Sequence, residues 1–314
     1  MAEGSSSHDL RERRKGVAYA VLAFTWWGLM PLYFKAVIHV EPMEVLAHRV
    51  VWALVFSGLL MTMSGRWSAS LAALRGVRPV LMLSASSALL AVNWGIFIWA
   101  VGQKRVMETS FGYYINPLVS MLLGVVFLRE RLDRLQGFAV LLAATGMSVL
   151  AWHLGGFPWI SITLALTFGL YGLLRKTVPV DSLAGLTFEC VVLLPVAAGY
   201  LGWRIQAGTD WFTHAGWHTT VLLIAAGPAT ALPLIWFGSA ARRIRLVTVG
   251  FLQYIGPTLT FSLAVLVFRE PFSQAHLMTT CFIALAITVF SWSVMRTVRE
   301  EALPASARPV APEI

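Results

Sequence analysis

Two ionisable residues interrupt long apolar stretches of this 314-residue chain, Arg49 and Glu189. A charge near the middle of a membrane costs at least about 2.5–3.5 kcal/mol, so such side chains usually face a protein-lined cavity. Arg49 could hold an anionic or carbonyl group of a solute, and Glu189 could bind a cation or relay protons. A buried structural ion pair is the alternative for both. His48 adjoins Arg49 and is a second candidate for proton coupling, because histidine titrates near neutral pH; packing is its alternative.

Further polar side chains fall on one face of a helix expected over residues 108–128. Thr109, Tyr113, Asn116 and Ser120 follow i, i+4, i+7 and i+11 spacing, which places them on one side of a helix. Such a stripe either lines a cavity or forms hydrogen bonds between helices. With polar and aromatic residues of neighbouring segments, it gives the predicted substrate-binding set: Arg49, Asn93, Trp94, Tyr113, Asn116, Gln253 and Tyr254.

Two prolines at related positions are the candidate hinges. Pro117 follows Asn116, and Pro257 lies 140 residues later. Proline removes one helix hydrogen bond and clashes with the preceding turn. A matched pair could therefore bend both halves of the chain in a rocking motion, with two static kinks as the alternative.

No catalytic constellation accompanies these residues. The sequence lacks GxSxG, HExxH, glycine-rich phosphate-binding and Walker patterns. Its two cysteines, Cys190 and Cys281, lie in apolar segments without CxxC or Cys/His ligand spacing. The sequence therefore predicts no enzyme, no cofactor and no metal site, and it excludes transport driven by ATP bound to this chain.

The composition is that of a membrane protein. Hydrophobic residues make up 58% of the chain and charged residues 12%, against about 45–50% and 25% in soluble domains. Apolar segments of about 20 residues recur, each long enough to cross a bilayer as a helix, and none alternates as a membrane β-strand would. Ten spans are predicted: 16–38, 44–63, 79–102, 108–128, 135–153, 157–177, 182–203, 217–241, 247–268 and 273–296.

Outside these spans, three polar segments remain. Residues 1–15 form an N-terminal tail and 297–314 a C-terminal tail, and the polar composition of 1–14 and 297–314 predicts disorder. Residues 64–78 combine Trp67 with leucines and arginines, which predicts a short helix at the membrane surface.

The basic residues set the expected orientation. With the N-terminus in the cytoplasm, 18 of the 24 Lys and Arg residues fall in inner segments and four in outer loops. This asymmetry favours ten spans with both termini cytoplasmic. Because the basic clusters alternate with apolar spans and form no patch with interleaved aromatic residues, nucleic acid is not an expected partner.

The chain repeats itself at an offset of 140 residues. Residues 111–130 and 251–270 share eight identities, where about two are expected by chance. The identities are Phe111, Tyr114, Ile115, Pro117, Leu123, Val125, Arg129 and Glu130 in the first copy. The predicted fold is an all-α membrane protein of two five-helix repeats, 16–153 and 157–296. Because five is odd, the second repeat is inverted, an arrangement that supports alternating access.

Four segments resemble the RarD permeases of the drug/metabolite transporter (DMT) superfamily, which carry EamA-type repeats. They are AHRVVW at 47–52, NWGIFIWAV at 93–101, GYYINPL at 112–118 and GFLQYIGPTL at 250–259. The resemblance covers residues 14–296 and implies an inner-membrane permease, in a family whose naming refers to chloramphenicol sensitivity and whose relatives move amino acids, other metabolites or drugs. Arg129 and Arg269 stand where the family commonly has glycine before glutamate, and we expect little effect on the transported species.

These observations predict a secondary transporter of a small organic solute that works by alternating access. An amino-acid-like metabolite or an amphipathic drug such as chloramphenicol is the expected cargo, bound in a central cavity lined by the second, third, fourth, seventh and ninth spans. A passive channel and a non-transporting membrane sensor or structural bundle are the alternatives. The expected location is the inner membrane. The expected partners are a small-molecule substrate and the lipid bilayer, and the sequence does not decide between a monomer and a homodimer.

Overall fold

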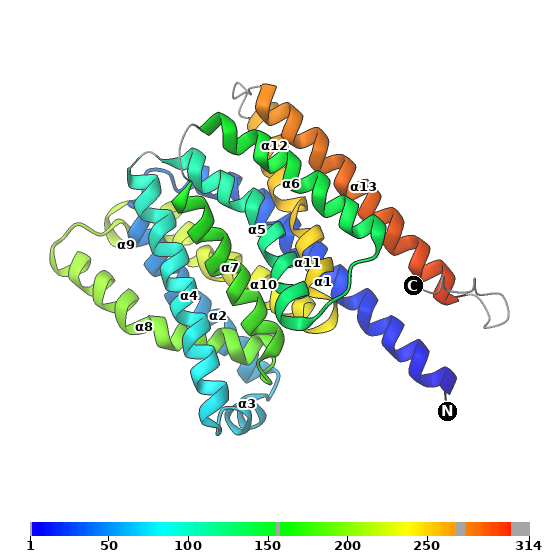
Figure 1. The fold of residues 1–314 in the computed structure, drawn as a ribbon. Helices are drawn as coiled ribbons and strands as arrows, with labels where there is room; N and C mark the ends of the chain where they lie inside the picture. Colours follow the sequence, from blue (N-terminus) through cyan, green and yellow to red (C-terminus); the bar gives the residue numbers. More distant parts are fainter. Residues whose placement is uncertain (1, 104, 155–157, 268–273, 303–314) are drawn as a thin grey trace.

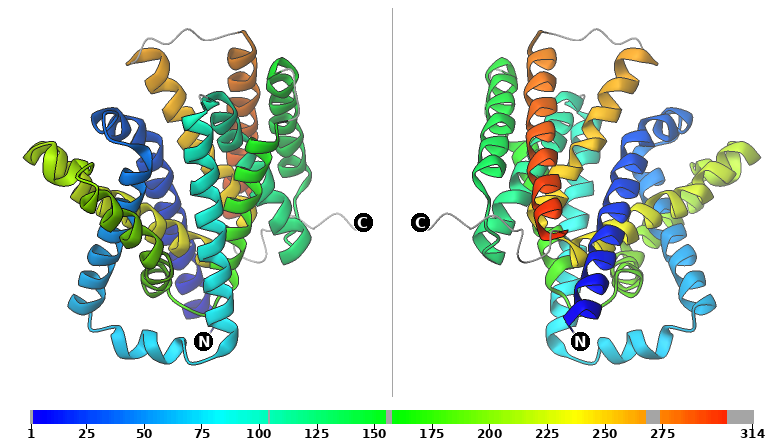
Figure 2. Two further views of the ribbon diagram at one scale, coloured as in Figure 1. Left: turned by 90° about the vertical axis from the view of Figure 1, so that its left-hand side faces the viewer. Right: turned by 90° about the vertical axis from the view of Figure 1, so that its right-hand side faces the viewer.

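The computed structural model describes residues 2–103, 105–154, 158–267 and 274–302, and the regular structure in those ranges is helical throughout. In chain order the helices are α1 (Ala2–Ala36), α2 (Pro42–Met63), α3 (Trp67–Ala73), α4 (Val77–Gly102), α5 (Val106–Leu128), α6 (Arg134–Leu154), α7 (Trp159–Thr177), α8 (Ser182–Gln206), α9 (Trp211–His214), α10 (Trp217–Arg243), α11 (Leu246–Gln253), α12 (Ile255–Leu266) and α13 (Gln274–Ala302). The long helices form one bundle (Figure 1), and the short helices α3 and α9 lie at its opposite ends (Figure 2).

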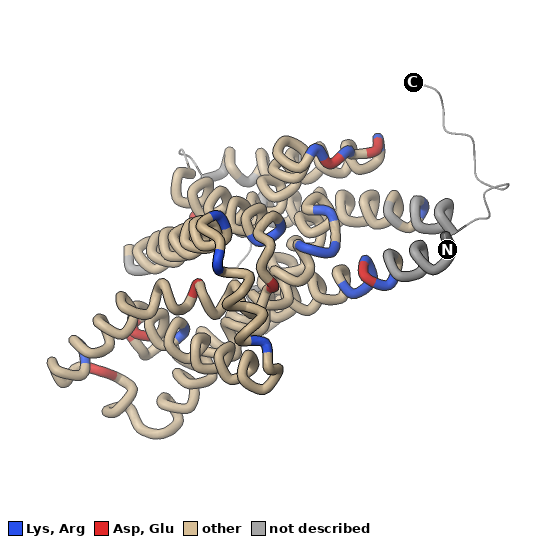
Figure 3. The backbone as a smooth tube through the Cα atoms, turned by 90° about the horizontal axis from the view of Figure 1, so that it is seen from below, with Lys and Arg blue, Asp and Glu red and all other residues tan. Residues whose placement is uncertain are grey.

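Each predicted apolar segment coincides with a long helix, except that the ninth is divided between α11 and α12. Within the described ranges, seven segments are long and apolar enough to cross a membrane: α1, α2, α4, α5, α8, α10 and the α11–α12 pair. Helices α6 and α13 contain shorter apolar stretches. Long parts of the backbone carry no charged residue (Figure 3), and many large apolar side chains are exposed, among them Leu22, Leu59, Phe127, Leu141, Val196 and Trp292. The chain is therefore a multi-pass membrane protein.

Helix starts at corresponding positions of the two halves use the same local chemistry. The Glu41 carboxylate accepts hydrogen bonds from the Met43 and Glu44 amides at the start of α2. The Asp181 carboxylate accepts hydrogen bonds from Leu183 and Ala184 at the start of α8, 140 residues later. Each carboxylate satisfies amides that have no partner within the helix, so the repeat preserves the signal that begins the helix.

The first predicted tail is ordered. Helix α1 begins at Ala2 and helix α13 runs on to Ala302, so the expectation of disorder is wrong for the described parts of 1–14 and 297–314. Residues 303–314 lie outside the described residues. Once an apolar span is helical, each added residue gains a hydrogen bond without a new nucleation cost, and the Lys15–Glu12 pair at 2.6 Å supports the extension. The short helix expected within 64–78 is confirmed as α3.

The principal helix contacts join the first half of the chain to the second. Helix α2 packs on α8 and α10, α1 on α10 and α12, α5 on α7 and α11, α4 on α7, and α6 on α13. Contacts within each half are fewer. The core is therefore shared between the halves, and neither half has a separate hydrophobic interior.

Candidate functional site

Arg49 lies on α2, inside the bundle, and side chains from three other helices contact it. Its Nε donates a hydrogen bond of 2.9 Å to the Thr230 hydroxyl on α10. Its guanidinium carbon lies 5.0 Å from the centroid of the Trp94 ring on α4 and 5.8 Å from that of Phe34 on α1. These are cation–π distances. No carboxylate forms an ion pair with Arg49 in the part of the chain that the structure describes, so the guanidinium has no counter-ion there.

Tyrosines complete the surroundings of Arg49. Tyr33 on α1 and Tyr113 on α5 both lie near the guanidinium. The Tyr113 ring lies 6.2 Å from that of Phe97 on α4, yet its side chain is 51% exposed. Arg49 is also only partly buried, although helices lie around it. Both side chains are therefore partly accessible, and aromatic rings lie beside the guanidinium. We call the set Arg49, Phe34, Trp94, Tyr113 and Thr230 the arginine centre.

Glu189 lies at a different place and carries its own counter-ion. Its carboxylate lies 3.7 Å from the Arg175 guanidinium of α7, and both side chains are 1% exposed. Ser86 of α4 donates a hydrogen bond of 2.6 Å to one carboxylate oxygen, and Tyr171 donates one of 3.3 Å to the other. Both carboxylate oxygens are thus hydrogen-bonded, whereas the Arg175 Nε and Nη1 have no hydrogen-bond partner in the described structure. Arg49 and Glu189 thus occupy separate polar centres and do not pair with each other.

Two glycines make room for the buried arginine of the second centre. A Cβ atom at Gly185 would overlap the Arg175 guanidinium, and one at Gly238 would lie 3.3 Å from its Nη2. The same Nη2 donates to the Ser182 carbonyl at 3.1 Å. Arg175 therefore fixes the crossing of α7, α8 and α10.

Three other predicted substrate-binding residues are buried with unused polar atoms. In the described structure, the Asn116 Oδ1, both amide atoms of Gln253 and the Tyr254 hydroxyl have no hydrogen-bond partner. Asn116 lies one turn from Tyr113 on α5. Buried polar groups without partners are uncommon, so these atoms are available to a ligand or to water.

Asn93 differs from this group because its amide nitrogen is occupied. It donates to the Leu164 carbonyl at 2.9 Å and to the Thr167 hydroxyl at 2.8 Å, which joins α4 to α7. Trp94, the next residue, faces Arg49 instead. Only the second of these neighbours therefore belongs to the arginine centre.

His48 points away from the arginine centre. It is 5% exposed, stacks on Phe212 at 4.9 Å and lies 4.0 Å from the Glu44 carboxylate. Neither ring nitrogen has a hydrogen-bond partner in the described structure. The Glu44 carboxylate already accepts a hydrogen bond from the Trp211 amide at 2.6 Å and pairs with Arg204 at 3.2 Å. His48 thus belongs to a third polar cluster, where α2 meets α8 and the α9 segment.

The two candidate hinge prolines differ in their effect. Pro117 lies within the continuous helix α5. Pro257 follows the break at Tyr254 that separates α11 from α12. Tyr114 donates a hydrogen bond of 3.4 Å to the Pro257 carbonyl, whereas the Tyr254 hydroxyl, its counterpart at the 140-residue offset, has no partner among the described residues. The two copies of the motif therefore differ locally: the second has a one-residue irregularity at Tyr254, whose dihedrals stay right-handed helical (φ −63°, ψ −16°), and only Tyr114 bonds to a proline carbonyl.

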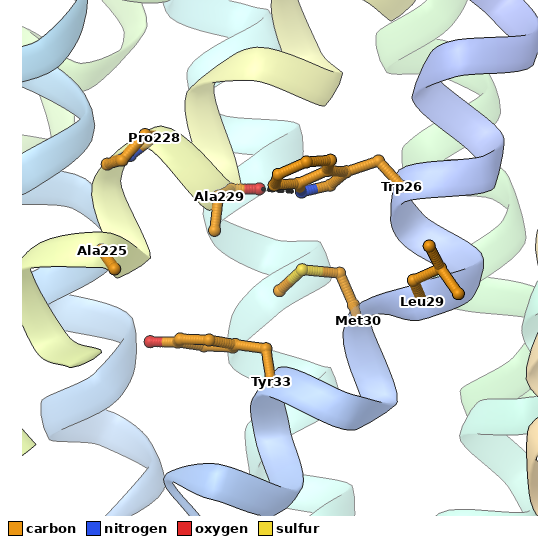
Figure 4. A pocket seen from close by; sticks show the side chains of 7 residues that line it. All are labelled: Trp26, Leu29, Met30, Tyr33, Ala225, Pro228 and Ala229. Carbon is orange, nitrogen blue, oxygen red and sulfur yellow. Dashed lines mark hydrogen bonds between the residues drawn. The ribbon is translucent and has the colours of Figure 1, made fainter.

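A cavity of about 330 Å³ lies between α1 and α10 and is almost entirely apolar. Figure 4 shows the Trp26 indole pointing to the Ala229 carbonyl, to which it donates a hydrogen bond of 3.0 Å. Pro233, four residues after Ala229, has no N–H to donate, so Trp26 replaces the missing helix hydrogen bond. None of the predicted substrate-binding residues lines this cavity.

Glu130, at the end of α5, is a residue whose importance the sequence did not predict. Its two carboxylate oxygens accept hydrogen bonds from the Leu246 and Val247 amides, at 2.7 and 2.8 Å, at the start of α11. Lys176 lies 3.8 Å from the same carboxylate and donates to the Ile244 carbonyl. We call these contacts the Glu130 latch, which joins α5 and α7 to α10 and α11.

The Glu130 latch depends on the residue before it. Arg129 has φ 54°, a left-handed conformation that favours glycine, and the Arg129 and Glu130 amides both bond to the Gly124 carbonyl. The repeated Arg-Glu pair at 129–130 and 269–270 was the signal that could have identified Glu130. For Arg175, no signal in the sequence distinguished it from a basic residue at the membrane surface.

Comparisons with known proteins agree with this architecture. The EamA-like transporter family matches residues 14–152. An uncharacterized transporter of Vibrio cholerae is 43% identical over 283 residues, which are 90% of this chain and 94% of that protein. Protein RarD of Escherichia coli is 41% identical over 93% of this chain and 98% of its own length.

A more distant relative and a solved structure extend the comparison. The chloramphenicol-sensitive protein RarD of Pseudomonas aeruginosa is 32% identical over 93% of this chain and 99% of its own. A crystal structure that is 16% identical has a TM-score of 0.70 over 88% of this chain and 97% of its own, which shows a shared fold. The chain therefore belongs to the RarD family of the DMT superfamily, a family of membrane transporters.

Proposed function

We propose that this protein is a secondary transporter that moves a small organic solute by alternating access, with the arginine centre as its substrate site. The observation that carries the proposal is the Arg49 charge, which lies within the bundle, is partly exposed and lacks a counter-ion among the described residues. An unneutralised charge at this depth is costly. In a transporter, a substrate group that binds the guanidinium offsets this free-energy cost.

Helix contacts support two inverted repeats of five spans. The 140-residue offset relates α1 to α7, α2 to α8, α4 to α10, α5 to the α11–α12 pair and α6 to α13. Under this exchange, the contact between α1 and α10 becomes the observed contact between α7 and α4. The contact between α5 and α7 becomes the observed contact of α11 and α12 with α1. The pairs α2–α8, α5–α11 and α6–α13 map onto themselves. This exchange is the relation expected for repeats 16–153 and 157–296, with ten spans in all.

Differences between the halves support alternation. The α5 motif is one helix through Pro117, whereas the related α11–α12 motif has a local irregularity at Tyr254, three residues before Pro257. If the halves exchange these conformations, the protein reaches a second state with the opposite side open. On the topology predicted by the basic residues, the Glu130 latch closes the cytoplasmic side in the present state, and both termini face the cytoplasm of an inner-membrane protein.

Two residues are the proposed proton-coupling groups. Glu189 is held by Arg175, Ser86 and Tyr171, and His48 lies beside Glu44 with both ring nitrogens free of hydrogen bonds in the described structure. A coupling role requires that replacement of the group changes the pH dependence of transport.

Counterflow into liposomes tests the function. Purified protein is reconstituted with an unlabelled solute inside, and accumulation of the labelled solute is followed for a panel of amino acids, organic acids and chloramphenicol. We expect transient accumulation of at least one member, loss of it in Arg49→Ala, and a shifted pH profile in Glu189→Gln. Non-saturating flux without counterflow would identify a channel, and absence of flux for the whole panel would favour a sensor or structural bundle.

A further inference from the structure

The two halves differ in charge at corresponding positions. Arg175 and Glu189 form the buried pair of the second half. At the 140-residue offset, the corresponding positions in the first half hold Lys35 and Arg49, both basic. Arg49 thus stands where the second half has Glu189, and Lys35 stands where it has Arg175.

Neighbouring helices support the two centres in related ways. Glu189 of α8 accepts a hydrogen bond from a hydroxyl on α4, that of Ser86. Arg49 of α2 donates a hydrogen bond to a hydroxyl on α10, that of Thr230, and α10 is the counterpart of α4. The second centre is closed and neutral, whereas the first is partly exposed and positive. One negative charge bound at Arg49 would supply the counter-ion that Glu189 has in Arg175 and that Arg49 lacks among the described residues.

We propose that the transported solute supplies this charge, and that it is a small monocarboxylate with a flat apolar body. The inference rests on the proposed function and names its substrate class. Because the Arg49 Nε is bonded to Thr230, both Nη groups remain to bind the two carboxylate oxygens, the arrangement that guanidinium favours. The apolar body lies against Trp94, Phe34 and Tyr113.

Two features argue for one carboxylate and against a neutral solute. In the contacts that the structure describes for the arginine centre, Arg49 is the one cation, and the ring-lined walls hold no second cation for a dianion such as a phosphate ester. A neutral solute would leave the guanidinium uncompensated. Uncharged drugs, chloramphenicol included, are therefore expected to bind weakly here.

Matched carboxylates and carboxamides test the proposal on the purified full-length protein. The probes are phenylacetate, indole-3-acetate and hexanoate, each compared with its amide, and binding is measured by thermal stabilisation and calorimetry. We expect each carboxylate to bind at least about tenfold more tightly than its amide, the usual effect of losing a charge-assisted hydrogen bond. Arg49→Gln should remove that preference, and Arg49→Lys should retain part of it.

Arg105→Gln is the matched control. Arg105 also lies against two tryptophan rings, Trp99 and Trp159, but already pairs with Glu108 at 2.6 Å. Its replacement should leave the carboxylate preference unchanged. Equal binding of carboxylates and amides by the unaltered protein, or a preference that survives in Arg49→Gln, would overturn the proposal.

Failure of this inference can be distinguished from failure of the proposed function. Counterflow of a neutral or cationic solute that Arg49→Gln leaves intact would refute the anion assignment and retain the carrier. Arg49-dependent carboxylate binding with no counterflow would retain the site and refute the carrier.

Discussion

Replacement of Glu130 by glutamine should weaken the Glu130 latch, which on the proposed orientation closes the cytoplasmic side. The carboxylate accepts hydrogen bonds of 2.7 and 2.8 Å from the Leu246 and Val247 amides. Hydrogen bonds to a charged group contribute about 1.5–3 kcal/mol each and neutral ones about 0.5–1.5 kcal/mol. Glutamine keeps one acceptor oxygen and loses the charge, so we expect the latched state to lose about 2 kcal/mol. This corresponds to about a 30-fold shift toward the unlatched state.

Amide hydrogen exchange in lipid nanodiscs measures this shift at the two bonded amides. The first amides of a helix have no partner within it, so protection at Leu246 and Val247 reports on Glu130 directly. We expect exchange of a peptide spanning the start of α11 to accelerate by about 30-fold in Glu130→Gln. Unchanged protection of these amides in the folded variant would refute the latch.

Asp181→Asn is the control for general loss of a helix cap. Its carboxylate accepts hydrogen bonds from Leu183 and Ala184, within two or three residues, and so closes no contact between the halves. We expect faster exchange at the start of α8 and no change at the start of α11. If Asp181→Asn also loosened α11, the effect of Glu130→Gln would reflect destabilisation of the bundle and not an unlatched state.

Three further predictions concern packing and pH. Gly185→Ala should destabilise the protein by about 3 kcal/mol or more in thermal melts, because the new methyl group overlaps Arg175. The control Gly199→Ala should show no such loss, because no atom lies within 4 Å of the added methyl group. Asn93→Ala should cost about 1 kcal/mol in the same assay, since it removes two hydrogen bonds between α4 and α7. The hydrogen bond from the Thr213 side chain lowers the pKa of Asp210, so its stabilising effect is present above about pH 4 and is lost as the pH falls through the lower folded pKa. A fluorescence titration of the α9 segment should show this transition at acid pH and lose it in Asp210→Asn.

The helices could be predicted from sequence because one physical property determines them. An apolar run of about 20 residues is the length that a helix needs to cross a membrane, and the ten predicted segments match the positions of the observed helices closely. Their ends were less predictable. Helix α1 extends back to Ala2 through polar residues, since a formed span propagates at little cost.

Side-chain partners were harder to predict, because spacing along one helix does not reveal which helix lies opposite. The spacing of Tyr113 and Asn116 was sufficient to place them on one face. It could not reveal that Asn93 would bond to Thr167 or that Glu189 would meet Arg175. Both partners come from α7, whose position against α4 and α8 follows from the fold and not from local sequence.

Residues that are identical in the two repeats form specific contacts in this structure, although the sequence alone suggests that they only maintain the fold. Residues shared by both copies could serve only to hold the fold. Glu130, however, is identical to position 270 and forms the Glu130 latch. Tyr114 is identical to Tyr254, but only Tyr114 bonds to a proline carbonyl in the described structure. If each half must adopt both conformations, a residue that makes a contact in one state must have an identical counterpart to make it in the other. On the proposed mechanism, alternation would therefore preserve the contacts that change between the two states. Substrate binding imposes no such requirement, because the solute is bound once, and this leaves Arg49 free to differ from Glu189.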